Sequence, residues 1–261
     1  VKLSYLIHGE GQPIIFIHGY GAKKEIWKPQ IKDICRKYKT ITFDLRGTGE
    51  SDRPDIPYTM KMLAEDIHGL MKAIEINKAH IVGRSFGGMI AQHFALMYPN
   101  KVDKLILIAT NYGRKDNDWV EIAQNGRLDE IETIKSDPIK AFNQKSKWVF
   151  HIKFRREMNR DPNKKFYESF SMNDLIKEST VNPSRPKDIR NQHIVRAKES
   201  KPKTQIKISP KITDNKTPKK VAPNWGDYFI YDFKVKQKVQ PILESAFYKF
   251  AETPIKGRIQ A

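Results

Sequence analysis

A serine flanked by glycines follows an apolar run in the first half of the chain. Residues 83–87 read GRSFG and match the pattern G-x-S-x-G, with Ser85 at its centre. The pattern alone is weak, because three fixed, common residues match by chance in about one chain of this length in ten. Here, however, a strand-like run (AHIVG) precedes the serine and a helical pattern starts directly after it. A sharp strand-to-helix turn exposes a serine hydroxyl and needs small neighbours. Ser85 is therefore a candidate nucleophile for acyl transfer.

A second glycine-containing motif could supply the hydrogen-bond donors that acyl transfer needs. Residues 18–21 read HGYG and directly follow another apolar run. A carbonyl under attack develops a negatively charged oxygen, and two preorganised N–H groups stabilise that charge. We assign these donors to the backbone amides of Tyr20 and Phe86. A third motif, DLRGTGES at 44–51, is predicted to form a structural turn.

A sheet must position these motifs, because each one follows or overlaps the end of a short apolar run. Such runs are typical of buried parallel strands. The four runs are 13–18 (PIIFIH), 40–44 (TITFD), 79–83 (AHIVG) and 104–109 (KLILIA). Apolar residues at helical spacing predict connecting helices around 27–38, 63–74 and 86–97. Alternating strands and helices predict an α/β fold, with a mostly parallel sheet and helices on both faces.

The pattern divides the chain into three parts. Residues 1–113 are predicted to form the N-terminal part of the core. The strand signal disappears in residues 114–190, where polar helical stretches predict a helical cap inserted into the core. Residues 191–261 are predicted to form a divergent C-terminal part of the core. They contain strand-like runs and a proline- and lysine-rich stretch, whose composition favours partial disorder.

The motifs HGYG, DLRGTGES and GRSFGG, in this order and spacing, resemble those of the α/β-hydrolase family of esterases, lactonases and related enzymes. The resemblance covers residues 1–113 closely and implies the α/β-hydrolase fold with a helical cap. It also implies hydrolysis of a small carboxylic ester, thioester or lactone, in which Ser85 forms an acyl-enzyme that water then cleaves. Neither a metal nor an organic cofactor is implied.

The family's catalytic order is serine, then an acid, then a histidine. Asp214 follows a strand-like run and is the candidate acid, with Asp227 and Asp232 as weaker alternatives. The histidine should come after the run YFIYDF at 228–233, but the chain has no histidine after His193. Use of His193 as the base would reverse the family order, and a loop or helix-surface histidine is its simpler interpretation.

The missing histidine leaves three explanations open. The chain could use an unusual base, it could have lost activity while keeping a binding pocket, or its tail could come from an altered reading frame or a truncated gene. The loss of family-like sequence near Gln192 supports the third explanation. The alternative function is therefore a catalytically inactive hydrolase-fold protein with a ligand-binding or regulatory role.

Composition limits the partners. The chain has 261 residues, and no apolar run approaches the roughly 20 residues that cross a bilayer. Its net charge of +18 could attract polyanions, but scattered lysines without a nucleic-acid-binding module predict a solvated surface and no specific nucleic acid. We expect a small-molecule substrate. Cys35 is the single cysteine and no leader pattern is visible, so the expected location is the cytoplasm. The sequence carries no signal for oligomeric state.

Overall fold

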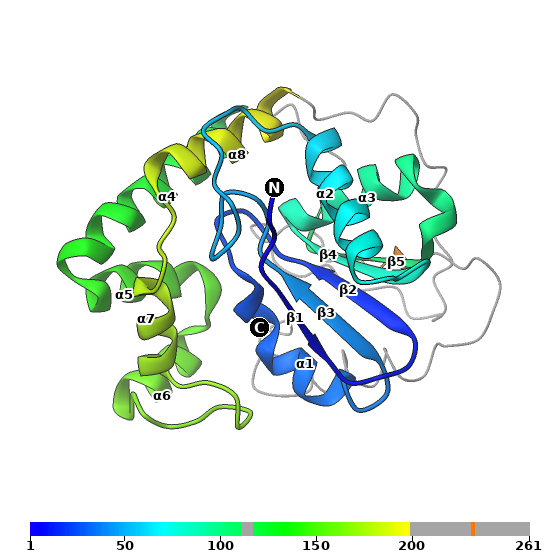
Figure 1. Ribbon diagram of the computed structural model, residues 1–261. Helices are drawn as coiled ribbons and strands as arrows, with labels where there is room; N and C mark the ends of the chain where they lie inside the picture. The colour runs from blue at the N-terminus through cyan, green and yellow to red at the C-terminus, as the bar shows by residue number, and fades with distance from the viewer. Residues whose placement is uncertain (111–116, 199–230, 233–261) are drawn as a thin grey trace, which may run out of the picture.

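The computed structural model describes residues 1–110, 117–198 and 231–232, which form a mixed sheet with helices on both faces and a helical lobe beside it (Figure 1). The sheet has six strands in the order β1-β3-β2-β4-β5-β6. The strands are β1 (Tyr5–His8), β2 (Pro13–Ile17), β3 (Lys39–Phe43), β4 (Ala79–Arg84), β5 (Val102–Ile108) and β6 (Tyr231–Asp232). The four central strands are parallel, and β1 and β6 pair antiparallel at the two edges.

The strand order places a reversal of direction between β2 and β4. From β2 the chain passes outward to β3, then returns to the other side of β2 for β4 and continues to β5. In open parallel sheets, ligand sites lie outside the carboxyl ends of the strands at such a reversal. The loops after β2 and β4 are those that carry the HGYG and GRSFG motifs.

Each face of the sheet is covered by helices whose buried residues recur at helical spacing. The helices of this part are α1 (Lys28–Ile34), α2 (Met60–Ala73) and α3 (Phe86–Met97), with 3-10 turns η1 (Lys24–Trp27) and η2 (Pro99–Lys101). Alternate strand residues point to opposite faces, so Ile15 and Ile17 join the core under α2 and α3, whereas Ile14 and Phe16 join the smaller core under α1. Burying each such side chain contributes roughly 1.5–3 kcal/mol.

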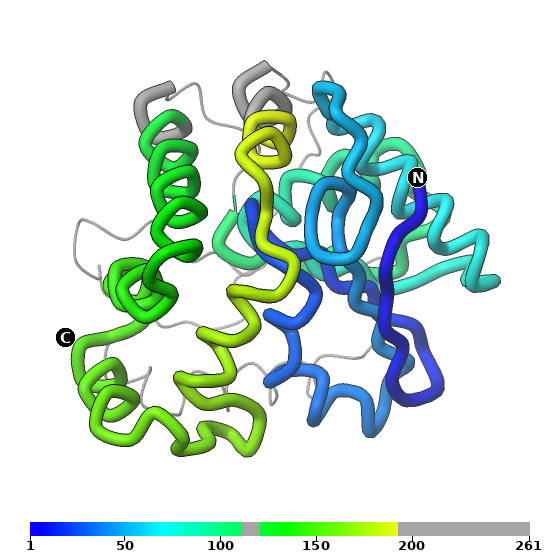
Figure 2. The backbone as a smooth tube through the Cα atoms, turned by 60° about the vertical axis from the view of Figure 1, so that its left-hand side comes forward, coloured from blue at the N-terminus to red at the C-terminus, as the bar shows by residue number. Residues whose placement is uncertain are grey.

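Within the described residues, five helices follow β5 and form the cap. They are α4 (Asn117–Ser136), α5 (Pro138–Val149), α6 (Ile152–Arg160), α7 (Met172–Thr180) and α8 (Pro186–Lys198). Phe142, Phe154 and Met158 are among the buried residues of a separate cap core. α4 and α8 lie side by side (Figure 2), and Ile189 of α8 is buried in the main core. Ile131 of α4 is buried in the same core, so the cap is joined to the sheet through both α4 and α8.

The predicted fold class is confirmed, and the four predicted strands and the helix at 86–97 occur within two residues of the expected bounds. Two features add to it: an antiparallel edge strand, β1, and the antiparallel β6 inside the run expected to be the last strand. Most of the expected C-terminal part of the core lies outside the described residues. Within the described residues, no helix is long and apolar enough to cross a membrane.

Candidate active site

Ser85 lies in a strained turn between β4 and α3. Its backbone has φ 52° and ψ −119°, a region that a residue with a Cβ atom enters only at a cost of about 1–3 kcal/mol. Besides the hydrogen bonds from α3, two others hold it there: the Ser85 N–H donates to the Ile108 carbonyl at 2.9 Å, and the Thr110 hydroxyl donates to the Ser85 carbonyl at 2.6 Å. The side chain of Ser85 is exposed. This geometry presents the hydroxyl outside the carboxyl end of the sheet.

The glycines on either side of the serine are sterically required. A Cβ atom on Gly83 would lie 2.4 Å from the Gly87 carbonyl oxygen, and a Cβ on Gly87 would lie 2.2 Å from the carbonyl oxygen of Ile17. Both distances are far below van der Waals contact, and both involve backbone atoms that cannot move aside without disturbing the sheet. The tight turn therefore permits only glycine at these two positions.

The loop after β2 lies directly beside the serine. β2 and β4 pair in register, with Ile17 opposite Gly83, so Gly19 comes to lie next to Ser85. A Cβ on Gly19 would be 3.4 Å from Ser85 Cβ and 3.9 Å from Ser85 Oγ. The structure thus brings the HGYG loop to the nucleophile that the sequence predicted.

The two predicted oxyanion-hole residues are in contact. The rings of Tyr20 and Phe86 meet edge to face with centroids 6.2 Å apart, and both side chains are buried. Phe86 opens α3, and the N–H groups of a first helical turn have no acceptor within the helix. The ring contact therefore fixes the loop carrying Tyr20 against the start of α3, where backbone donors can be shared with a ligand.

His18 holds this loop in place. It is fully buried, its Nδ1 lies 2.9 Å from the Gly19 carbonyl, and its Nε2 accepts the Leu45 N–H at 3.1 Å. These partners require a proton on Nδ1 and occupy the lone pair of Nε2. Burial lowers the pKa of His18, which keeps the ring neutral. His18 is a structural link between the loops after β2 and β3, with no lone pair left to accept a proton from Ser85.

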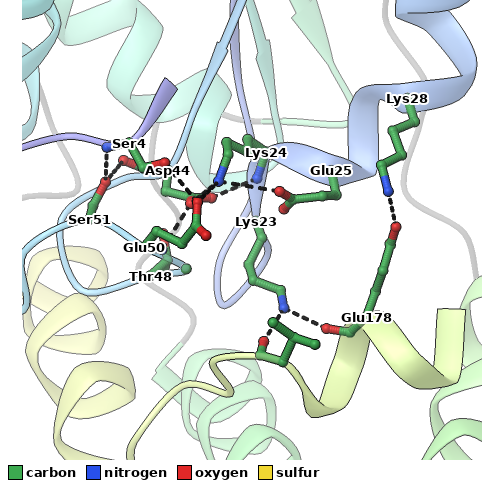
Figure 3. Close-up of polar contacts among 12 residues, drawn as sticks. Ser4, Lys23, Lys24, Glu25, Lys28, Asp44, Thr48, Glu50, Ser51 and Glu178 are labelled. Carbon is green, nitrogen blue, oxygen red and sulfur yellow. Dashed lines mark hydrogen bonds and ion pairs between the residues drawn. The ribbon is translucent and has the colours of Figure 1, made fainter. Parts of the chain in front are cut away.

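The DLRGTGES segment is organised around a buried carboxylate (Figure 3). Asp44 is 0% exposed and accepts hydrogen bonds from the Lys24 N–H and Nζ, both at 2.8 Å, and from the Glu50 N–H at 3.0 Å. Burial by itself would raise the pKa of Asp44, but these hydrogen bonds outweigh burial and lower it. Gly49 approaches so closely that a Cβ there would lie 2.1 Å from an Asp44 oxygen. The segment forms a turn around Asp44.

The cap contacts the HGYG loop through residues that the sequence patterns did not identify. Arg127 of α4 donates to the Tyr20 carbonyl at 3.1 Å, and the Tyr20 hydroxyl donates to the carbonyl of Ile189 in α8 at 3.0 Å. The Gly21 N–H donates to Gln192 Oε1 at 3.4 Å. More than 100 residues of chain separate the partners, and neither Arg127 nor Gln192 belongs to a motif, so no local pattern could have identified them.

The predicted acid and base fall on or beyond the edge of the described structure. His193 belongs to α8, next to Gln192, but its side chain is outside the described residues, as are Asp214 and Asp227. Asp232 lies in β6. The remaining histidines have other surroundings: His68 stacks on Tyr98, His80 is buried beside Tyr38, His151 caps α6, His8 is on the edge strand β1, and His93 is on α3.

Within the described residues, no group of three histidine, cysteine or acidic side chains could hold a metal ion. The described residues place an exposed serine on a strained turn, with the HGYG loop and the start of α3 beside it and a helical cap in contact with that loop. Such a constellation suits nucleophilic attack on a carbonyl and stabilisation of the resulting oxyanion.

Comparison with known proteins identifies the fold family. Residues 12–173 match the family described as alpha/beta hydrolase fold. A pimeloyl-(acyl-carrier protein) methyl ester esterase of Pseudoalteromonas atlantica is 35% identical over 119 residues, which are 45% of this chain and 45% of the esterase. A 2-hydroxy-6-oxo-6-(2'-aminophenyl)hexa-2,4-dienoic acid hydrolase of Metapseudomonas resinovorans is 35% identical over 114 residues, 42% of this chain and 39% of that protein. The chain thus spans less than half the length of these relatives.

Solved structures share the fold over a longer stretch. An enol-lactonase of Burkholderia xenovorans matches with a TM-score of 0.56 and 20% identity, over 75% of this chain and 70% of that chain. A thermophilic esterase of Thermogutta terrifontis matches with a TM-score of 0.55 and 23% identity, over 75% of this chain and 67% of that chain. At these identities the likeness concerns the fold.

Proposed function

The chain belongs to the α/β hydrolase fold family, and within it we propose that this protein is a serine hydrolase acting on a small carboxylic ester, thioester or lactone. The observation that carries the proposal is the strained backbone of Ser85, at φ 52°, beside the loop of Gly19 and Tyr20. Strain of this kind persists only where surrounding contacts enforce it, and it is concentrated at functional sites. A purely structural serine has no need of it.

The proposed reaction follows from the positions of the groups. Ser85 Oγ attacks the substrate carbonyl carbon while a base takes the hydroxyl proton, and the carbonyl oxygen becomes an oxyanion that accepts hydrogen bonds from the Tyr20 and Phe86 amides. The leaving alcohol, thiol or lactone oxygen departs with that proton. Water then attacks the acyl-enzyme by the same route, which releases the acid and restores Ser85.

We assign the base to His193. Its helix, α8, contacts the HGYG loop through the neighbouring Gln192 and through Ile189, which accept hydrogen bonds from Gly21 and Tyr20. The described surroundings of His18 exclude that residue, since Nε2 is already an acceptor. Asp214 is the proposed acid partner. Both assignments extend the sequence prediction and depart from the usual order of the three residues along the chain.

The substrate class is supported by a relative whose name describes ester hydrolysis, the pimeloyl-(acyl-carrier protein) methyl ester esterase. The second candidate is a protein that uses the same site to bind a ligand without turning it over. One observation favours it: the chain has no histidine after His193. A serine without a base retains little reactivity, because loss of one member of a triad costs several orders of magnitude in rate.

Fluorophosphonate labelling followed by intact-mass measurement distinguishes the two candidates. The probe reacts with an activated serine and needs no knowledge of the substrate. We expect one adduct on the wild type, none on Ser85→Ala, and slow labelling of His193→Ala. His151→Ala, which replaces a histidine capping a cap helix, is the matched control and should label like the wild type. A folded wild-type protein that takes up no label would establish the binding-only alternative.

A further inference from the structure

The junction between α5 and α6 exposes three large apolar side chains within five consecutive residues. Trp148 is 73% exposed, Val149 is 51% exposed and Ile152 is 43% exposed. Phe150, between them, packs against the cap core. The backbone of this junction is therefore anchored, while a tryptophan and two aliphatic side chains face solvent. Large apolar side chains that gather on a protein surface can mark an interaction site.

The outward face of α6 continues this apolar surface with positive charge. Phe154 and Met158 turn the opposite face of the helix into the cap core. Ile152, Arg156 and Arg160 follow one another at intervals of four residues, so they share one face of the helix. Figure 1 shows α6 at the end of the cap lobe, well away from the sheet.

A groove of about 500 Å³ runs along this face. It is lined by Lys153, Arg156, Glu157, Arg160, Asp161 and Lys164. Its two carboxylates are already engaged, because Glu157 pairs with Lys164 and Asp161 accepts backbone N–H groups of the following turn. The other three lining side chains, those of Lys153, Arg156 and Arg160, are cations. None of them forms an ion pair with a side chain of residues 1–110 or 121–192. The groove therefore has positive charge to offer to an anionic group.

We propose that the α5–α6 junction and the outward face of α6 form a docking surface for an anionic lipid bilayer. Tryptophan is enriched where proteins meet the membrane interface, and basic side chains beside an apolar surface attract anionic head groups. Residues 140–165 contain nine lysines and arginines against two acidic residues. Lys145 and Lys165 pair with Glu130 and Asp174 outside this range, and the remaining positive charge complements such a membrane. Duplex nucleic acid would use the cations but would leave Trp148, Val149 and Ile152 without a partner. The inference does not depend on catalysis by Ser85.

Vesicle flotation with the full chain tests the proposal. Vesicles of phosphatidylcholine alone are compared with vesicles of phosphatidylcholine mixed with phosphatidylglycerol. We expect binding to the mixed vesicles and little to phosphatidylcholine alone, with affinity falling as salt is raised. Equal binding to both kinds of vesicle, or binding to neither, would overturn the proposal.

A pair of charge variants locates the surface. Each basic residue near an anionic membrane contributes about fivefold in affinity, so Arg156→Gln with Arg160→Gln should weaken binding to mixed vesicles by roughly 25-fold. The control, Lys61→Gln with Lys72→Gln on α2, removes the same charge from exposed positions on the core. It should change the affinity by less than about twofold, because its charges lie beyond the reach of screened electrostatics. An equal loss in the control would mean that only net charge matters, which contradicts a docking surface.

Tryptophan fluorescence tests the apolar part independently. Trp148 emission should shift to shorter wavelength on mixed vesicles, and Trp148→Phe should bind without that shift. Trp148→Ala should bind less well, whereas Ile139→Ala, which truncates a 57% exposed residue at the other end of α5, should not. The membrane proposal would be wrong if Trp148→Ala bound vesicles as well as the wild type and the arginine variant lost affinity for duplex DNA as strongly as for vesicles. The surface would then be a groove that binds polyanions in general.

Discussion

Replacement of Asp44 by asparagine should destabilise the fold by about 3–5 kcal/mol, the cost of breaking a buried ion pair by removing one partner. Asp44 is 0% exposed and Lys24 is 4% exposed. In the wild type, one carboxylate oxygen accepts the Lys24 N–H, and the other accepts the Lys24 ammonium and the Glu50 N–H. The oxygen of the asparagine side chain can still accept the Lys24 N–H, but its NH2 group would then face the ammonium and the Glu50 N–H. The Lys24 ammonium and the Glu50 N–H each lose a charge-assisted hydrogen bond of about 1.5–3 kcal/mol, while the ammonium keeps its ion pairs with Glu25 and Glu50. The sum of the two losses reaches the same range (Figure 3).

Urea unfolding followed by tryptophan fluorescence measures this change, since Trp27 lies in the same 3-10 turn as Lys24. The control is Asp33→Asn, which removes an exposed carboxylate 3.7 Å from Arg36 and should cost less than about 1 kcal/mol. Equal slopes with urea would show that both variants unfold to comparable states. A loss below about 1 kcal/mol for Asp44→Asn would refute the reasoning, because Asp44 would then be replaceable as the centre of the turn.

The pH dependence of the unfolding free energy tests the contribution of Asp44 independently. The pKa of Asp44 lies below its ordinary value of 3.8, so the stability it provides is fully present above pH 3.8 and is lost as the pH falls through the lowered pKa. The difference in unfolding free energy between the wild type and Asp44→Asn should therefore stay constant from pH 7 to about pH 4 and shrink below it. A difference that grew as the pH fell would contradict the assignment.

Three further predictions test the turn and the cap. Gly87→Ala should prevent folding or cost several kcal/mol, because its Cβ would lie 2.2 Å from the Ile17 carbonyl oxygen; Gly69→Ala, in open space on α2, should stabilise by about 1 kcal/mol, and thermal unfolding compares the two. The free energy of unfolding in urea should be about 1 kcal/mol higher for Ser85→Gly than for Ser85→Ala, since glycine adopts positive φ without strain. Equal unfolding midpoints would show an unstrained turn. Asp188→Asn should expose the cap to limited proteolysis, since this buried carboxylate pairs with two arginines; an unchanged cleavage rate would argue against that role.

The parts of the site that could be predicted are those that depend on neighbours in the chain. The strained turn at Ser85 follows from small residues between an apolar strand and a helix, and the loop of Tyr20 follows from the apolar run directly before it. The approach of that loop to Ser85 depends on the pairing of β2 with β4, which are distant in the chain. The role of His18 needed the structure, because the Leu45 N–H that occupies Nε2 comes from the next strand's loop. Contacts of Arg127 and Gln192 were out of reach for the same reason: they join loops brought together only by the cap.

The C-terminal predictions are of another kind. The assignment of Asp214 as the acid depends on its place after a strand-like run. The assignment of His193 as the base depends on its being the last histidine, so both assignments depend on order along the chain. His193 does not follow the family order of serine, acid and histidine. The structure places only its backbone near the HGYG loop, because the neighbouring Gln192 accepts a hydrogen bond from the Gly21 N–H. These two assignments stay predictions, whereas the fold around Ser85 is confirmed.

The most direct test of the proposed acyl-enzyme is peptide mapping after brief reaction with p-nitrophenyl butyrate, quenched in acid. We predict a burst of p-nitrophenol approaching one equivalent of protein, a butyryl group on the peptide that contains Ser85, and loss of both in Ser85→Ala. A butyryl group on lysines alone, or equal p-nitrophenol release from Ser85→Ala, would contradict the account of Ser85 as the nucleophile.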